Sequence, residues 1–135
     1  KPILHELINS EPIMICSNPD KTVVRGDKFM ICAGLLAEYY EKIGGKVEYF
    51  GKPFPEIYKF TYSKMKESDK KILVIGDSLD NDIKGANLQK LDSILITSGI
   101  HRDVNNDCGV DKDKLNDLIR TKNIIPTFYM RNLEF

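Results

Sequence analysis

The stretch KKILVIGDSLDNDIKGA, Lys70 to Ala86, decides the class of fold. It opens with a near-continuous apolar run, Lys71 to Ile75, which is typical of a parallel strand buried on both faces. Gly76 and Asp77 end the run, and the pattern from Asp80 to Lys90 predicts a helix. A carboxylate therefore follows the carboxyl end of a strand directly, and ligands of open parallel sheets collect at such ends.

The alternation of strands and helices continues on both sides of this stretch. We predict a buried strand and a loop in Pro12 to Asp20, and further strands around Val47 and in Ser93 to Thr97. The segment IIPTFYM is predicted to form either a final short strand or a docked tail. Apolar residues at helical spacing predict helices in three places: from Phe29 to a stop at Gly44-Gly45, after Pro53 and Pro55, and around Leu115. Strands and helices in this order predict right-handed βαβ units and the α/β fold class.

Composition bounds the class of protein. The 135 residues carry 20 basic and 20 acidic side chains, so the chain has no net positive field to hold nucleic acid, and no apolar segment is long enough to span a membrane. Its cysteines lack the spacing of a zinc or dithiol site, which favours reduced thiols in a cytoplasmic protein. His5 and His101 have no partner at metal or triad spacing, so neither is predicted to be catalytic, but His101 follows a strand end and a place at the rim of the site stays open for it. The cysteines are Cys16, Cys32 and Cys108.

The acids after the Lys71 to Ile75 strand suit a metal site. Asp77 follows the strand on a loop that Gly76 lets approach a ligand closely, and Asp82 begins the next helix. Mg²⁺ takes one or two carboxylates together with waters and a substrate phosphate. The alternative is structural, with Asp80 or Asn81 capping the helix and Asp82 interacting with its dipole.

Lys52 strengthens the functional reading. It follows a strand and precedes a helix that begins with prolines, in the segment FGKPFPEIY. A lysine in that place can present its ammonium to a phosphate dianion. The segment Gly-Lys-Pro-x-Pro followed by strand-Gly-Asp-x4-Asp is far more specific than either part alone.

These motifs carry a family resemblance. YFGKPFPEIY and ILVIGDSLDNDIKGA resemble the third and fourth motifs of the haloacid dehalogenase (HAD) superfamily of phosphohydrolases. The segment from Cys16 to Lys46 further resembles the subgroup with a large α/β cap inserted before the third motif, the nitrophenylphosphatase-like, or class IIA, enzymes. The resemblance implies a cytoplasmic hydrolase for small phosphorylated substrates, with residues 1–50 as the end of the cap and 51–135 as the C-terminal part of a Rossmann-like core.

The resemblance also assigns roles. It makes Lys52 the group that steadies the nucleophile and the transferring phosphoryl group, and Asp77 the acid that binds Mg²⁺. Asp82 matches the second acid of the fourth motif, either as a metal ligand or as a group that orients one. Lesser candidates are Ser78 and Asn81 from the same loop, and Asn18 and Asp20 from the cap, where a substrate contact and a structural turn are both open.

The aspartate nucleophile of this family is missing. Its Asp-x-Asp motif follows a strand, whereas Asp80-Asn81-Asp82 lies within the fourth motif and Asp111-Lys112-Asp113 reads as a helix cap. We therefore expect part of a phosphatase whose nucleophile lies outside this chain, inactive alone, that self-associates or pairs with a missing N-terminal half. The alternative is a non-catalytic fragment that acts at most as a binding or structural module.

Overall fold

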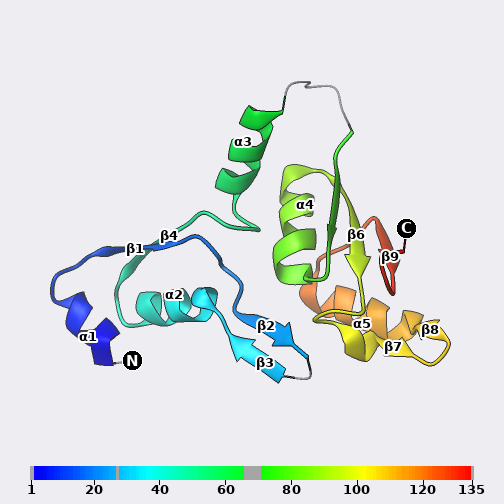
Figure 1. Cartoon of the computed structure of the whole chain (residues 1–135), viewed down its shortest axis with the longest axis horizontal. Helices are drawn as coiled ribbons and strands as arrows, with labels where there is room; N and C mark the ends of the chain where they lie inside the picture. The colour runs from blue at the N-terminus through cyan, green and yellow to red at the C-terminus, as the bar shows by residue number, and fades with distance from the viewer. Residues whose placement is uncertain (1, 27, 66–70, 135) are drawn as a thin grey trace.

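The computed structural model describes residues 2–26, 28–65 and 71–134 (Figure 1). The first elements are α1 (Pro2–Ile8), β1 (Ile13–Cys16), β2 (Thr22–Arg25), β3 (Lys28–Ile31), α2 (Ala33–Lys42) and β4 (Lys46–Tyr49). They are followed by α3 (Pro55–Lys64), β5 (Leu73–Gly76), η1 (Leu79–Ile83), α4 (Lys84–Gln89), β6 (Asp92–Ile96), η2 (Arg102–Val104), β7 (Asn105–Asn106), β8 (Gly109–Val110), α5 (Lys112–Lys122) and β9 (Phe128–Met130).

The sheet that bears the predicted acids consists of β5, β6 and β9, all parallel. Ile75 lies opposite Ile94 in the first pair, and Leu95 lies opposite Tyr129 in the second. Because the strands are parallel, the loops after β5 and β6 leave the sheet at the same edge. The predicted α/β class with a parallel sheet is confirmed.

A hydrophobic core anchors the loop after β5. Leu79 and Ile83 of η1 are fully buried and belong to one cluster with residues from β6, η2 and α5. Side chains on both sides of Asn81 are therefore fixed by packing, so the polar residues between them have a defined position. The cluster is formed by Leu79, Ile83, Leu95, Val104, Leu115 and Ile124.

Two strands are less buried than the sequence predicts. On β5, Leu73 and Ile75 are 47% and 45% exposed, so the prediction of a strand buried on both faces is wrong. Within the described residues, β5 pairs only with β6, and its other edge is open. Likewise β1, predicted as a buried strand, exposes Ile13 and Ile15, which lie two residues apart and so share one face of the strand.

The helix predicted from Phe29 begins later. Residues 28–31 form β3, which pairs with β2 in an antiparallel hairpin, and α2 begins at Ala33. The apolar residues of this four-residue strand are too few to distinguish the period of a strand from that of a helix, and the pairing with β2 decides between them. Gly26 makes the turn possible because it adopts a φ of +59°. The predicted stop is confirmed, since α2 ends just before Gly44.

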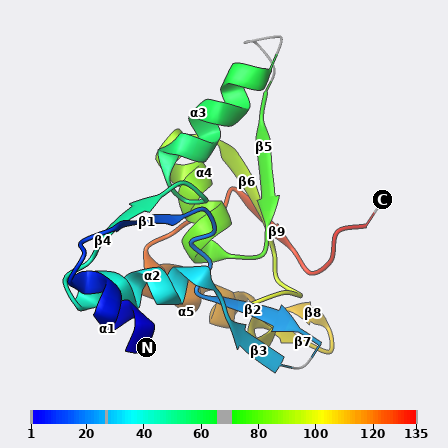
Figure 2. The ribbon, with the colours of Figure 1, turned by 60° about the vertical axis from the view of Figure 1, so that its left-hand side comes forward.

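Helix α3 lies beside α4 in both views of the ribbon (Figures 1 and 2). The Tyr58 side chain of α3 is buried against Gly85 of α4, where a β-carbon would collide with the tyrosine hydroxyl. The other residues of the predicted apolar face are exposed, namely Ile57, Tyr62 and Met65. Within the residues that the structure describes, no helix combines the length and apolar character that a membrane span needs.

The strands form separate sheets on either side of Gly51. β1 pairs with β4 and β2 with β3, whereas β5, β6 and β9 pair among themselves, and β7 pairs with β8. In Figure 1 the elements up to β4 lie on the left and the β5-β6-β9 sheet lies on the right. The division into 1–50 as cap and 51–135 as core stays a prediction.

Candidate active site

Asp77 lies directly after β5, in the loop that faces the end of β6. Its Oδ2 accepts a hydrogen bond of 3.1 Å from the backbone N–H of Ile100. The carboxylate lies so close to Gly99 that a β-carbon there would collide with it. Asp77 lies in the loop after β5, and its carboxylate is held in place by the backbone of the loop after β6. The other carboxylate oxygen, Oδ1, makes no hydrogen bond within the described part of the chain.

Ser78 organises the start of the next helix. Its hydroxyl accepts a hydrogen bond of 3.2 Å from the backbone N–H of Asn81, so Ser78, and not Asp80 or Asn81, is the N-terminal cap. The five residues from Leu79 form a turn of π-helix, a rare conformation that is frequent at functional sites. The Ser78 carbonyl accepts from the N–H groups of both Asp82 and Ile83.

Asp82 is buried beneath this turn and points back to β5. Its Oδ2 accepts a hydrogen bond of 3.1 Å from the N–H of Ser78. Its carboxylate lies against Gly76, where a β-carbon would collide with it. The sequence predicts that Gly76 lets the loop approach a ligand; in the structure Gly76 makes room for Asp82.

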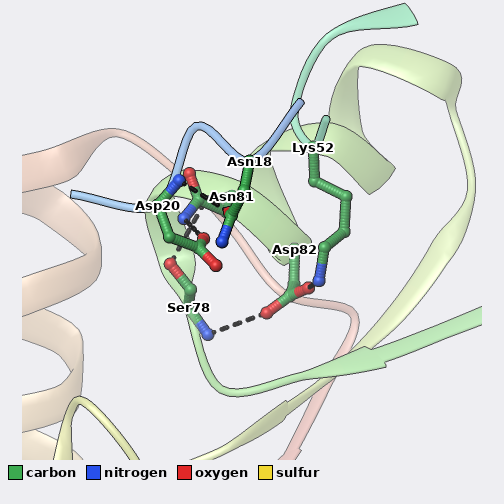
Figure 3. Close-up of polar contacts among 6 residues, drawn as sticks. All are labelled: Asn18, Asp20, Lys52, Ser78, Asn81 and Asp82. Carbon is green, nitrogen blue, oxygen red and sulfur yellow. Dashed lines mark hydrogen bonds and ion pairs between the residues drawn. The ribbon is translucent and has the colours of Figure 1, made fainter. Parts of the chain in front are cut away.

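Lys52 lies in the segment after β4 and reaches the loop from Asp77 to Asp82, which we call the acid loop. Its Nζ forms an ion pair with Asp82 Oδ1 (Figure 3). The lysine side chain is 50% exposed, whereas that of Asp82 is 6% exposed. The structure thus brings together two groups that the sequence predicts as partners in one site, although 30 residues separate them in the chain.

Asn18 and Asp20 form a turn beside the same loop. The Asp20 N–H donates a hydrogen bond of 3.1 Å to Asn18 Oδ1, as in an Asx turn. The Asn81 side-chain amide donates a hydrogen bond to Asp20 Oδ1 (Figure 3). The structure therefore joins two predicted site residues, Asp20 and Asn81, and gives Asn18 the role of a turn residue.

Two further groups support the loop: His101, for which the sequence leaves open only a place at the rim of the site, and Lys122, which the sequence does not single out. His101 Nε2 accepts a hydrogen bond of 3.2 Å from the N–H of Leu79, and burial, with a smaller contribution from Lys122, lowers the pKa of this histidine. The Lys122 ammonium forms an ion pair of 2.7 Å with Asp80. No sequence spacing reveals these contacts, because both residues reach the loop only through the packing of β6 and α5.

A cavity of about 760 Å³ opens beside the loop. Its volume lies within the range usual for small-molecule sites. One side is aromatic, since Tyr49 and Phe54 stack with their ring centroids 4.7 Å apart. Ser78 and Asn81 line another side, so the cavity meets the acid loop.

The residues present fit a magnesium ion at Asp77. The free oxygen of the Asp77 carboxylate can serve as a hard ligand, and Mg²⁺ takes its remaining ligands from waters and phosphate. Both oxygens of Asp82 are already engaged, by Lys52 and by the Ser78 N–H, so Asp82 is better placed to orient the loop than to bind metal directly. Within the described ranges, no three His, Cys, Asp or Glu side chains cluster as metal ligands.

Comparison with protein families decides the identity. The family model of haloacid dehalogenase-like hydrolases matches residues 3–88, and a HAD-hydrolase-like model matches residues 49–133. The chain belongs to the haloacid dehalogenase-like hydrolases. The family predicted from the sequence is confirmed. The segments that resemble the third and fourth motifs, residues 49–58 and 72–86, lie within both matches, and the segment from Cys16 to Lys46 lies within the first.

Known HAD-like proteins resemble this chain over part of their length. The ribonucleotide monophosphatase NagD of Escherichia coli K12 is 36% identical over 87 residues, which cover 64% of this chain and 34% of NagD. A haloacid dehalogenase-like hydrolase from Brucella suis is 31% identical with a TM-score of 0.72, over 98% of this chain and 48% of that protein. This HAD-like chain thus spans about a third of its curated relative and about half of that solved structure.

One solved HAD-like neighbour contains a metal. A glycerol phosphate phosphatase from Mycobacterium tuberculosis, in complex with calcium, is 26% identical with a TM-score of 0.56. The alignment covers 70% of this chain and 28% of that protein. A divalent cation therefore occurs in a neighbour of this fold.

Proposed function

We propose that this chain is part of a Mg²⁺-dependent phosphatase of the nitrophenylphosphatase-like subgroup that hydrolyses small phosphomonoesters. The observation that carries the proposal is the ion pair between Lys52 and Asp82 at the carboxyl end of β5. It places the Lys52 ammonium beside the loop whose first residue, Asp77, has a free carboxylate oxygen. A phosphate dianion and a divalent cation need such a combination of charges.

Each residue has a role in this proposal. Asp77 holds Mg²⁺, which when bound supplies charge stabilisation to a phosphoryl oxygen. Lys52 binds the phosphate; because half of its side chain is exposed, it can contact a ligand while it stays near Asp82. Asp82 keeps the lysine in place, and Ser78 and Asn81 hold the turn that carries Asp82.

The nucleophile belongs to a segment outside these 135 residues. An aspartate that forms the aspartyl-phosphate must lie beside Asp77 and Lys52, and the open edge of β5 is where another parallel strand can bring it. In this proposal residues 1–50 are the end of a cap and 51–135 are part of the core. The cytoplasmic location predicted from the sequence is part of the same proposal.

The substrate contacts are proposed at the cavity. Pro19, between Asn18 and Asp20, lines it together with Tyr49 and Phe54. The name of NagD states a ribonucleotide monophosphatase, and that of the mycobacterial neighbour a glycerol phosphate phosphatase. We propose the substrate class that these names share, a small phosphomonoester, for the complete protein.

Binding of Mg²⁺ and inorganic phosphate to the purified chain tests the proposal. We expect NMR shifts at Ser78 and Ile100 on adding Mg²⁺, and a further shift at Gly51 on adding phosphate. The first set should be lost in Asp77→Asn and the second in Lys52→Ala, whereas Lys114→Ala, which removes an exposed lysine of α5, should keep both. A chain that binds neither ion would contradict the proposal and favour a non-catalytic module.

Turnover is a separate test. We expect no hydrolysis of p-nitrophenyl phosphate by this chain alone, because the nucleophile is supplied from elsewhere. Mg²⁺-dependent turnover that Asp77→Asn abolishes, in material free of host phosphatases, would show that the chain contains its own nucleophile. That result would contradict the expected inactivity and leave the metal site supported.

A further inference from the structure

Asp20 and Asn81 connect two segments that are 61 residues apart in the sequence. Asp20 lies in the loop after β1, and Asn81 lies in η1 at the carboxyl end of β5. The Asn81 amide donates its hydrogen bond across the space between these segments to the Asp20 carboxylate (Figure 3). A hydrogen bond to a charged group is stronger than one between neutral groups.

The Asp20 end of this hydrogen bond is held by its own segment. The Asp20 N–H donates to Asn18 Oδ1, and its carbonyl accepts a hydrogen bond of 3.0 Å from the N–H of Gly34. Gly34 packs so tightly on the Pro19 carbonyl that no β-carbon fits between them. The loop from Asn18 to Asp20 is therefore fixed to the start of α2.

The Asn81 end is held equally well. Its N–H donates to the buried hydroxyl of Ser78, and its carbonyl accepts from the N–H of Lys84 in the following helix. Leu79 and Ile83, on either side in the sequence, are fully buried. The hydrogen bond thus joins two rigid backbones and restrains the distance between them.

The ion pair of Lys52 and Asp82 also reaches η1, but from the segment after β4. Gly51, the residue before the lysine, packs on the Pro19 ring and the Ser17 carbonyl, where no β-carbon fits. Lys52 and Asp20 therefore extend from one packed unit, and their partners, Asp82 and Asn81, are consecutive residues. A half-exposed ion pair is weak and has to order a long side chain, so it is poorly suited to hold the segments together alone.

We propose that Asp20 and Asn81 are positioning residues, whose hydrogen bond holds the loop after β1 against η1 and thereby keeps the Lys52 ammonium at Asp82. This role is distinct from a substrate contact of Asp20. It involves neither metal nor phosphate, so it can be tested whether or not the proposed function holds.

The reactivity of the Lys52 amine measures this positioning. In the full chain, an amine-acylating reagent followed by mass spectrometry gives the rate at Lys52 relative to Lys114. An ion-paired ammonium reacts slowly, so Asp20→Ala should raise the relative rate roughly threefold, as expected for losing a modest ion pair. Asp20→Asn, which retains an acceptor oxygen for Asn81, should react nearly as the wild type.

A control variant distinguishes loss of the hydrogen bond between Asp20 and Asn81 from a general destabilisation of the same part of the chain. Glu38→Ala removes the ion pair of 3.1 Å between Lys21 and Glu38, which lies in the same part but does not reach η1. We expect the Lys52 rate of this variant to stay at the wild-type value. An equal rise in Glu38→Ala and Asp20→Ala would overturn the proposal.

A swap of the two partners keeps the test decisive if a single variant misfolds. Asn81→Asp opposes two carboxylates and should raise the Lys52 rate. Adding Asp20→Asn restores an amide and a carboxylate with the donor on the other side, and should return the rate toward the wild-type value. A folded double variant, checked by circular dichroism, in which Lys52 still reacts as fast as in Asn81→Asp would overturn the proposal.

Discussion

Lys52 and Asp82 form an ion pair with one end in solvent and the other in the protein interior. The buried carboxylate has a second hydrogen bond from the Ser78 N–H, so it stays satisfied on one side even when the lysine moves. The lysine alone can therefore respond to an anion that arrives from solvent. This asymmetry suits a group that binds a ligand and returns to the same resting position.

Removing the lysine should destabilise the chain moderately. In Lys52→Ala the buried Asp82 carboxylate loses its cation, and we expect the free energy of unfolding to fall by about 1 to 2 kcal/mol, less than for a fully buried pair because the lysine is half exposed. Urea denaturation measures the change, with Lys114→Ala as the matched control. Equal midpoints for both variants would mean that the pair contributes no stability.

Gly99 should be intolerant of a side chain because of Asp77. A β-carbon at residue 99 would occupy the position of the carboxylate, so Gly99→Ala should cost about 1 to 3 kcal/mol and remove the hydrogen bond from the Ile100 N–H. In the Asp77→Ala background the same substitution should cost clearly less, since the colliding group is gone. A double-mutant cycle by urea denaturation measures this coupling, and additive costs would contradict the predicted collision.

His101 should make stability depend on pH. Because burial lowers its pKa below the ordinary value of about 6.5, the unfolded chain binds a proton more readily than the folded chain, and stability falls as the pH drops below that value. Protonation of Nε2 would also end its hydrogen bond with the Leu79 N–H. Denaturation between pH 7.5 and 5 should show a smaller loss for His101→Gln than for the wild type.

Magnesium should stabilise the chain through Asp77. A ligand that binds only the folded state at ten times its dissociation constant adds about 1.4 kcal/mol to the free energy of unfolding. We expect this increase in the wild type and in Asp107→Asn, which alters an exposed acid near the β7-β8 turn, but not in Asp77→Asn. Thermal denaturation with and without Mg²⁺ measures it, and an equal shift in all three proteins would indicate nonspecific binding.

The open edge of β5 should make the isolated chain associate. The edge strand exposes Leu73 and Ile75, and unpaired strand edges with apolar side chains recruit other strands. Sedimentation velocity should reveal concentration-dependent association that Leu73→Lys weakens. Leu88→Lys, on the exposed face of α4, is the control. A wild-type chain that stays monomeric at all concentrations would contradict this prediction.

The sequence predicts a strand best where the local apolar pattern agrees with the strand pairing of the structure. The apolar runs of β5 and β6 could be recognised because parallel strands need continuous apolar character. The hairpin of β2 and β3 could not, since the spacing around Phe29 also fits a helix and only the antiparallel pairing of these two strands excludes a helix there. The exposure of β1 and β5 depends on which segments cover them, and a local pattern carries no such information.

In the candidate site too, some features can be predicted from the local sequence and others depend on tertiary packing. That Lys52 lies close to Asp82 could be predicted because each follows or precedes a recognisable element at a fixed spacing, whereas the roles of Lys52, Asp77 and Asp82 stay a prediction. That Asp82 lies on Gly76, and that His101 supports Leu79, depends on contacts across the sheet edge. Such contacts arise from tertiary packing, and the residues that make them have no distinctive spacing in the sequence.

The π-turn of η1 has a consequence for how this loop can change in evolution. Each residue of an α-helix rotates the chain by about 100°, and a residue of a π-turn rotates it by a somewhat smaller angle, so deleting or inserting one residue between Leu79 and Ile83 would turn the residues after it to another side. Asn81 and Asp82 could no longer face Asp20 and Lys52 together, whatever amino acids were retained. The length of this loop should therefore be under as strong a selection as its chemistry, and insertions or deletions should be tolerated elsewhere before they are tolerated here.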